Sequence, residues 1–232
     1  MNSAPNLINE GEYANVKGSD LRVMSLVGIA HFFSHFYIYL LPPLFPFLKT
    51  ALNVSYTELG LLMAVFSGTT GLTQIPFGFL VDRFGAKFIL IAGLAVEGIA
   101  FSCMGFAPGY PFLVALMFLA GAANGVYHPA DYAILSASVS KTRMGRAFSL
   151  HTFGGYAGFA VAGPVIIFLN STIGWSLGLL ICGVAGIGTA FVLMLYSRDL
   201  KHTVQRNDNV IDQKTKTKSS ADSGVKLLLS PS

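Results

Sequence analysis

Between residues 78 and 87 the sequence reads Gly78-Phe79-Leu80-Val81-Asp82-Arg83-Phe84-Gly85-Ala86-Lys87. This stretch places three charged residues and a glycine turn between two long apolar segments, residues 58–80 and 88–106. Each segment is long enough to cross a bilayer, which takes ~20 apolar residues. The sequence therefore predicts two membrane-spanning helices joined by a short charged turn.

The composition of the whole chain is typical of a membrane protein. Of its 232 residues, 53% are hydrophobic and 11% are charged, whereas a soluble domain carries about 25% charged residues. Cys103 and Cys182 both lie in apolar runs, so we interpret them as small core residues and expect neither a disulfide nor a metal site. The net charge of +4 could suggest nucleic acid binding, but the positions of the basic residues favour a membrane topology, and we expect no nucleic acid partner.

Six apolar segments have the length of a transmembrane helix, which predicts an all-α membrane protein. They are residues 22–48, 57–81, 88–107, 111–138, 146–169 and 173–197. Glycines are frequent within them, and small residues let helices approach closely in lipid. The resulting domain prediction is a cytoplasmic N-terminal segment at 1–21, a six-helix bundle at 22–197, a flexible cytoplasmic linker at 198–224 and the truncated start of a seventh helix at 225–232.

The basic residues predict the orientation of these spans. All of them except Lys49 fall on one side of the predicted membrane. Because cytoplasmic loops carry an excess of Lys and Arg, both termini are expected in the cytoplasm. Residues 1–21 are polar and mixed, without the layout of a cleaved signal peptide. We therefore expect a multi-pass protein of the plasma (inner) membrane.

Ionisable residues inside the predicted spans are functional candidates, because such side chains are costly in lipid. His31 and His35 share one face of the first span, where they could carry a coupling proton or bind an anionic substrate. The alternative is that each histidine bonds to a neighbouring helix. Glu97, in the third span, is either a proton site or a protonated carboxyl with a structural hydrogen bond. His151, in the fifth span, is also a candidate, although a structural role is the favoured interpretation there.

The densest polar group lies in the fourth span. Asn124, His128 and Asp131 have the spacing i, i+4 and i+7, which places them on one helical face. We predict that this face lines a central cavity and that Asp131 is either protonated or paired with charged His128. The alternative is a structural polar contact between helices. Tyr127 and Tyr132 flank the group and are interpreted as packing or cavity wall.

The charged turn resembles the cytoplasmic loop signature of the major facilitator superfamily of secondary transporters, G-x-L-x-D-R-x-G-x-K. Ala86 departs from the signature, which usually has a basic residue there. The resemblance implies the N-terminal six-helix half of a transporter that works by alternating access, with a C-terminal six-helix half as its partner. It also implies a gating motif made of Gly78, Asp82, Arg83, Gly85 and Lys87, of which Asp82 faces a helix N-terminus of the other half.

Two further stretches bear on the branch of the family. The run from Gly154 to Pro164 partly resembles a glycine-proline antiporter motif. The runs 127–132 and 151–155 resemble the fosmidomycin-resistance branch of drug exporters. Gly121 stands where many proton-coupled members have a buried arginine, so His and carboxylate groups would have to carry the proton.

The sequence thus predicts proton-coupled export of a small organic molecule or drug. Uptake of an organic anion, sugar or nitrate by symport is the alternative, and a fragment that does not transport is a third possibility. The chain contains neither an H-E-x-x-H nor a G-x-S-G motif, so we do not expect an enzyme. No cofactor is predicted. The expected partners are the lipid bilayer, a small-molecule substrate and protons.

Overall fold

The computed structural model describes residues 10–200, with side chains from residue 18 onward. All regular structure in this part of the chain is helical. The predicted seventh-helix start and nearly all of the predicted linker lie outside the described residues. The helices are α1 (Glu10–Leu40), α2 (Phe45–Leu52), α3 (Tyr56–Phe84), α4 (Ala86–Met104), α5 (Tyr110–Asn124), α6 (Tyr127–Ser138), α7 (Met144–Ile173) and α8 (Trp175–Leu195), with short 3-10 helices at Pro42–Leu44 and Lys141–Arg143.

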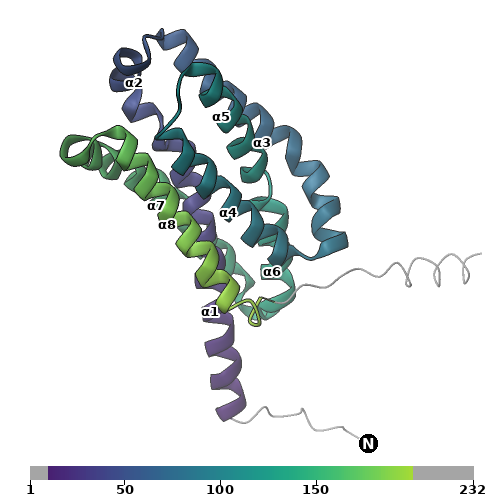
Figure 1. Cartoon of the computed structure of the whole chain (residues 1–232). Helices are drawn as coiled ribbons and strands as arrows, with labels where there is room; N and C mark the ends of the chain where they lie inside the picture. Colours follow the sequence, from purple (N-terminus) through teal and green to yellow (C-terminus); the bar gives the residue numbers. More distant parts are fainter. Residues whose placement is uncertain (1–9, 201–232) are drawn as a thin grey trace, which may run out of the picture.

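Each of the six predicted spans corresponds to helical structure. The second span, α3, is 29 residues long and lies alongside α5 (Figure 1). Polar residues such as Thr69 and Gln74 lower the mean hydropathy of α3, and this helix is not among the apolar segments given next. Among the described residues, the segments that are both long and apolar enough to cross a membrane are Gly18–Leu52, Ala86–Met104, Tyr110–Ser138, Lys141–Ile173 and Trp175–Leu195.

Two of the predicted spans are interrupted. The first span ends at Leu40, because Pro42 and Pro43 cannot continue the backbone ladder, and α2 follows as a separate helix. The helix of this span, α1, begins at Glu10 and so extends beyond the apolar segment that starts at residue 22. The fourth span is divided into α5 and α6 around Gly125.

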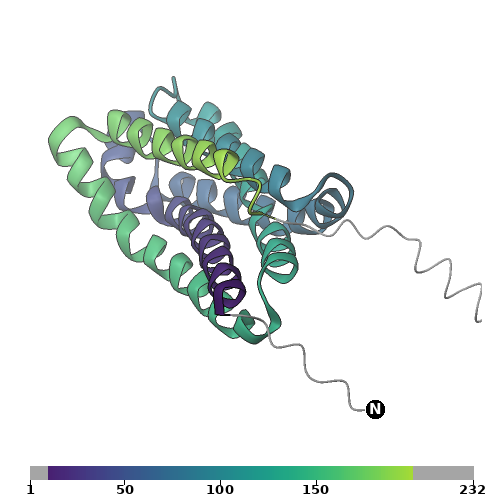
Figure 2. The same cartoon turned by 90° about the horizontal axis from the view of Figure 1, so that it is seen from below.

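The helices pack in pairs, α1 on α7, α4 on α8 and α3 on α5 (Figures 1 and 2). Glycines make the closest approaches possible. A Cβ atom added at Gly158 of α7 would lie 2.9 Å from the backbone nitrogen of Phe36 and would also collide with the carbonyl oxygen of Phe32. Gly154 lies similarly against the backbone of Gly28. Close packing of this kind is the main source of helix association in lipid.

Replacing Gly158 with alanine is expected to destabilise the bundle. The new methyl group would push α7 away from α1, and overpacking of this kind costs about 1–3 kcal/mol. The matched control is Gly188→Ala in α8, where a Cβ meets nothing within 4 Å. Thermal unfolding of the purified protein should show a lower Tm for Gly158→Ala and an equal or higher Tm for Gly188→Ala. Equal Tm values in the two variants would contradict this packing.

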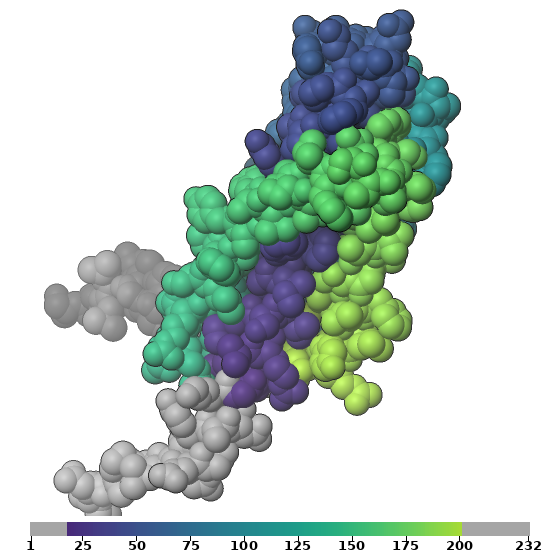
Figure 3. All heavy atoms as spheres, turned by 90° about the vertical axis from the view of Figure 1, so that its left-hand side faces the viewer, coloured from purple at the N-terminus to yellow at the C-terminus, as the bar shows by residue number. Residues whose placement is uncertain are grey.

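Part of the outer surface of the bundle is strongly apolar. In the view of Figure 3, α7 crosses in front of α1 and lies beside α8. Large side chains of α7 on its exposed surface include Phe153, Tyr156 and Phe168. Exposed apolar side chains of this size suit contact with lipid chains or with further helices.

The turn between α3 and α4 is as tight as the sequence predicts. Only Gly85 separates the two helices, and its φ of +96° falls in the region that favours glycine. The Gly85 N–H donates to the carbonyl oxygen of Val81 at 2.9 Å. Asp82 and Arg83 are exposed in the last turn of α3, and Lys87 lies in the first turn of α4.

Ion pairs connect helix ends on the side of the bundle that holds this turn (Figure 1). Asp20 of α1 forms a 2.8 Å ion pair with Arg143 and accepts a 3.1 Å hydrogen bond from the Ser140 N–H. On the same helix, Arg22 pairs with Asp199 at 3.4 Å. These contacts join the start of α1 to the α6–α7 connection and to the segment after α8.

Candidate functional site

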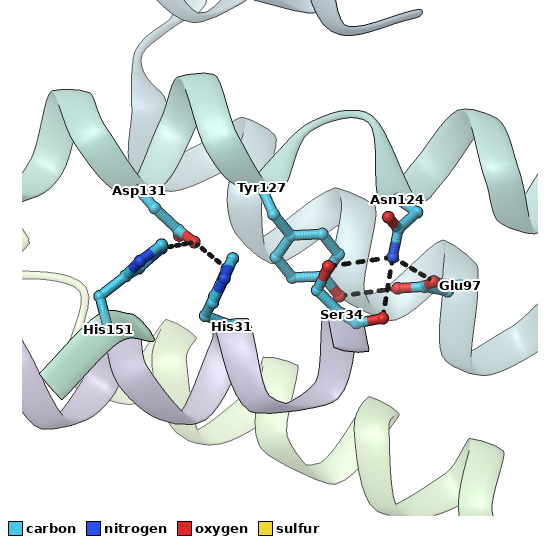
Figure 4. Close-up of polar contacts among 7 residues, drawn as sticks. All are labelled: His31, Ser34, Glu97, Asn124, Tyr127, Asp131 and His151. Carbon is cyan, nitrogen blue, oxygen red and sulfur yellow. Dashed lines mark hydrogen bonds and ion pairs between the residues drawn. The ribbon is translucent and has the colours of Figure 1, made fainter. Parts of the chain in front are cut away.

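A carboxylate and two histidines from three different helices meet inside the bundle (Figure 4). Asp131 of α6 is fully buried. Its Oδ2 atom lies 3.1 Å from Nδ1 of His31 in α1 and 3.0 Å from Nε2 of His151 in α7. Both histidines are buried as well. An ionised Asp131 therefore receives a hydrogen bond from each ring when both nitrogens carry hydrogen.

The two rings also contact each other. The centroids of His31 and His151 lie 3.6 Å apart, with an angle of 26° between the ring planes. Two positive charges at this separation would repel strongly in a buried site. The arrangement therefore favours at most one charged ring beside the Asp131 carboxylate. A cluster of one carboxylate and two imidazoles carries a charge of −1 without an extra proton and is neutral after it gains one.

Two more histidines flank this cluster without bonding to it. The His35 and His128 rings lie 4.6 Å and 5.3 Å from the His31 ring, measured between centroids. Each is half-buried, and the Nδ1 atom of each is buried without a hydrogen-bond partner. The Oδ1 atom of Asp131 also has none.

The pair of Asp131 with His128, one of the two alternatives that the sequence offered for Asp131, does not form in the structure. Although the two residues belong to the same helix, Asp131 bonds to His31 and His151. Asp131 points from α6 toward α1, whose packing along α7 brings His151 to the same place (Figure 4). His151, for which a structural role was favoured, is a direct partner of the carboxylate.

A second polar network surrounds Glu97 of α4. Its Oε1 atom accepts a 2.9 Å hydrogen bond from Asn124, and its Oε2 atom accepts a 2.8 Å bond from the Tyr127 hydroxyl. Asn124 also donates to the Oγ and the carbonyl oxygen of Ser34 in α1, each at 3.1 Å. Asn124, predicted to join His128 and Asp131, instead belongs to this network (Figure 4). Tyr127 and Asp131 both belong to α6 and lie one turn apart, so the two networks are adjacent along this helix.

The break between α5 and α6 has its own stabilising contacts. The Thr70 hydroxyl in α3 lies 3.0 Å from the Gly121 carbonyl oxygen and 2.9 Å from that of Phe66 in its own helix. The Thr73 hydroxyl lies 3.4 Å from the Ala122 carbonyl oxygen and 2.8 Å from that of Thr69. These contacts add to the hydrogen bonds that the Gly121 and Ala122 carbonyls accept from the Gly125 N–H. Sequence reasoning missed both threonines as well as Ser34, because hydroxyl side chains in a span carry no distinctive pattern.

The ring nitrogens of His31, His128 and His151 lie within 4.8 Å of one another, a spacing that metal sites also show. In the described structure, however, the nitrogens of His31 and His151 that face the cluster are bonded to the same carboxylate oxygen. We therefore treat the group as a hydrogen-bonded cluster.

The Glu97 network predicts a large stability effect. Glu97→Ala removes the acceptor of the Tyr127 hydroxyl and one acceptor of Asn124, and a buried unsatisfied donor costs about 1–3 kcal/mol. Glu97→Gln retains a carbonyl oxygen for Tyr127. Thermal unfolding should therefore show a clearly lower Tm for Glu97→Ala than for Glu97→Gln. Two variants that unfold at the wild-type temperature would show that the network adds nothing to stability.

The comparison with known proteins identifies the family. A family model described as the Major Facilitator Superfamily matches residues 27–232. The chain belongs to this superfamily. It is therefore a multi-pass membrane protein of a transporter family, and not an enzyme.

Several relatives in this superfamily have names that mention organic anions. A probable sulfoacetate transporter, SauU of Cupriavidus necator, is 25% identical over 155 residues, which cover 66% of this chain and 36% of that protein. A probable L-galactonate transporter of Escherichia coli is 24% identical and covers 67% and 34% respectively. The probable galactarate/D-glucarate transporter GudP of Escherichia coli is 28% identical over 140 residues, 58% of this chain and 31% of that protein. The matches thus span about a third of each relative.

Solved structures give the same fold. The chain superimposes on a bacterial homolog of the human lysosomal transporter Spinster, in an inward-facing and occupied conformation, with a TM-score of 0.69. The sequence identity is 18%, and the match covers 81% of this chain and 46% of that structure. At this identity the likeness supports the fold alone.

Proposed function

We propose that this chain forms the N-terminal six-helix half of a secondary active transporter that moves a small organic anion together with protons. The observation that carries the proposal is the fully buried Asp131, held by His31 and His151 and paired with no Lys or Arg among the described residues. Titratable groups at this depth commonly mark proton pathways in transporters. The cluster would hold one proton in each transport cycle.

The proposed substrate class comes from the relatives. Three of them are named as probable transporters of sulfoacetate, L-galactonate and galactarate or D-glucarate. An anion that enters with a proton brings less net charge into the membrane, which makes symport a consistent mechanism. Proton-coupled drug export, as in the fosmidomycin-resistance branch, is the second candidate and is supported by the partial glycine-proline motif between Gly154 and Pro164.

A transport assay separates these candidates. The protein is purified from cells that express its complete gene and is reconstituted into proteoliposomes with an imposed pH gradient. Sulfoacetate, galactonate and galactarate are offered as labelled substrates, with fosmidomycin as the drug. We expect at least one acid to accumulate on the alkaline side. Movement of fosmidomycin against the proton gradient, with no accumulation of any acid, would replace the symport proposal with export.

The proposed location is the plasma (inner) membrane, with both termini in the cytoplasm. The connection between α6 and α7, which contains Lys141 and Arg143, is joined to the start of α1 by the Asp20–Arg143 ion pair. The helix α2, which carries Lys49, lies at the opposite end of the bundle in Figure 1. The basic side is expected to face the cytoplasm.

Cysteine labelling tests this orientation. In a background with both native cysteines replaced by serine, Ser171→Cys and Thr142→Cys each introduce one exposed thiol, at opposite ends of α7. An impermeant maleimide added to intact cells should label Ser171→Cys at once. Thr142→Cys should react only after permeabilisation, and the reverse pattern would overturn the assignment.

A further inference from the structure

His35 and His128 are the two histidines of the bundle that the proposed proton site does not use. They come from different helices, α1 and α6, yet both lie next to the same ring, that of His31. No hydrogen bond is found for either ring among the described residues, and the Nδ1 atom of each is buried without a partner. The Nε2 atom of each ring is not among the buried atoms and also has no hydrogen bond among the described residues, so Nε2 is the nitrogen that a ligand could reach.

The surroundings of the two rings differ from those of the Asp131 cluster. Both side chains are half-buried, whereas Asp131 is completely enclosed. His35 packs edge-on against Phe159, at 4.5 Å between ring centroids, and His128 lies 5.7 Å from Tyr132. Part of each histidine side chain is therefore accessible, whereas the Asp131 carboxylate is enclosed.

Space around His35 depends on a glycine of α7. A Cβ atom at Gly155 would come within 3.0 Å of the His35 ring, at both Cε1 and Nδ1, and equally close to the His31 ring. Any larger residue at this position would press on both histidines at once. Gly155 therefore allows the two rings to lie together against α7.

We propose that His35 and His128 bind the anionic group of the substrate, and that they do so when the Asp131 cluster holds its proton. An imidazole N–H donates readily to a carboxylate or sulfonate oxygen. An unprotonated cluster carries the negative charge of Asp131 a short distance away and repels the anion. A protonated cluster is neutral and removes this repulsion, so the proton binds first.

The proposal rests on the proposed function for its substrate class and adds the residues and the order of binding. The charge balance involves every titratable group that surrounds the carboxylate. These groups are His31 and His35 from α1, Tyr127, His128 and Tyr132 from α6, and His151 from α7.

Binding measurements on the whole protein test this inference without a gradient or transport. The probes are galactarate and sulfoacetate, with uncharged galactitol for comparison, titrated calorimetrically at pH 5.5 and pH 7.5. We expect at least one of the two anions to bind more tightly at pH 5.5 and galactitol not to bind. His35→Phe and His128→Phe, which keep a ring and remove both nitrogens, should each weaken anion binding by at least about tenfold, because a hydrogen bond to a charged group is lost. Thr189→Ala in α8, which alters an exposed hydroxyl outside the site, should leave binding unchanged.

A second variant tests whether the charge of the Asp131 cluster controls anion binding. Asp131→Asn removes the negative charge, so anion binding should become nearly independent of pH while His35 and His128 remain. Anion affinity that is unchanged in both His35→Phe and His128→Phe, or no binding of either probe to the wild type, would overturn the anion site. Failure of accumulation in proteoliposomes with these binding results intact would instead contradict the proposed transport function.

Discussion

Asp131→Asn is expected to abolish proton-driven accumulation of substrate, down to the level of vesicles without protein. The substitution keeps the size of the side chain but removes the only buried carboxylate that His31 and His151 share. With a neutral amide in its place, the cluster can no longer exchange a proton for each transport cycle. Facilitated exchange of labelled for unlabelled substrate, which needs no gradient, should persist.

The control for this variant is Asp199→Asn. Asp199 also pairs with a basic residue, Arg22, but at the exposed end of the bundle, where ion pairs contribute only about 0–1 kcal/mol. Its replacement should leave accumulation within the range of the wild type. If Asp131→Asn accumulates substrate as well as Asp199→Asn does, the Asp131 cluster is a structural contact and not the coupling site.

The second large effect is expected at the charged turn. Asp82→Asn should eliminate both accumulation and exchange while membrane insertion and Tm stay normal. Asp82 is exposed at the end of α3 and has no hydrogen bond or ion pair among the described residues, so its replacement costs the bundle little. By the family signature, its charge acts on a helix N-terminus of the other half during gating.

This prediction separates gating from coupling. Asp82→Asn should lose exchange, whereas Asp131→Asn should keep it. Asp82→Glu, which preserves the charge, serves as the matched variant and should retain part of the activity. Exchange at the wild-type rate in Asp82→Asn would show that this carboxylate has no part in gating.

Most of the helical framework could be predicted from the sequence, because a span is a local property. Uninterrupted apolar length is enough to place α4 and α8, and Gly85 between two charged helix ends is enough to place the turn. The break after α5 could not be predicted in the same way. Gly125 looks like any packing glycine of a membrane helix, and the hydroxyls that contact the nearby carbonyls come from α3.

The residues of the candidate site could be predicted more easily than their partners. Burial cost alone identifies Asp131, His31 and His151 as unusual within a span. Which histidine faces the carboxylate depends on how α1, α6 and α7 cross, and residues 100 positions apart meet there. The spacing of residues along the fourth span predicted His128 as the partner of Asp131. The packing of the helices instead places His151 beside this carboxylate.

The pH dependence of transport in proteoliposomes tests the central claim, that Asp131 with His31 and His151 is the proton site, most directly. Initial rates of accumulation are measured from pH 5 to pH 8 for the wild type, Asp131→Asn and Asp199→Asn. The account predicts a marked rise in rate toward acid for the wild type and Asp199→Asn, and a flat profile at background for Asp131→Asn. The same pH profile and rate in all three proteins would contradict it.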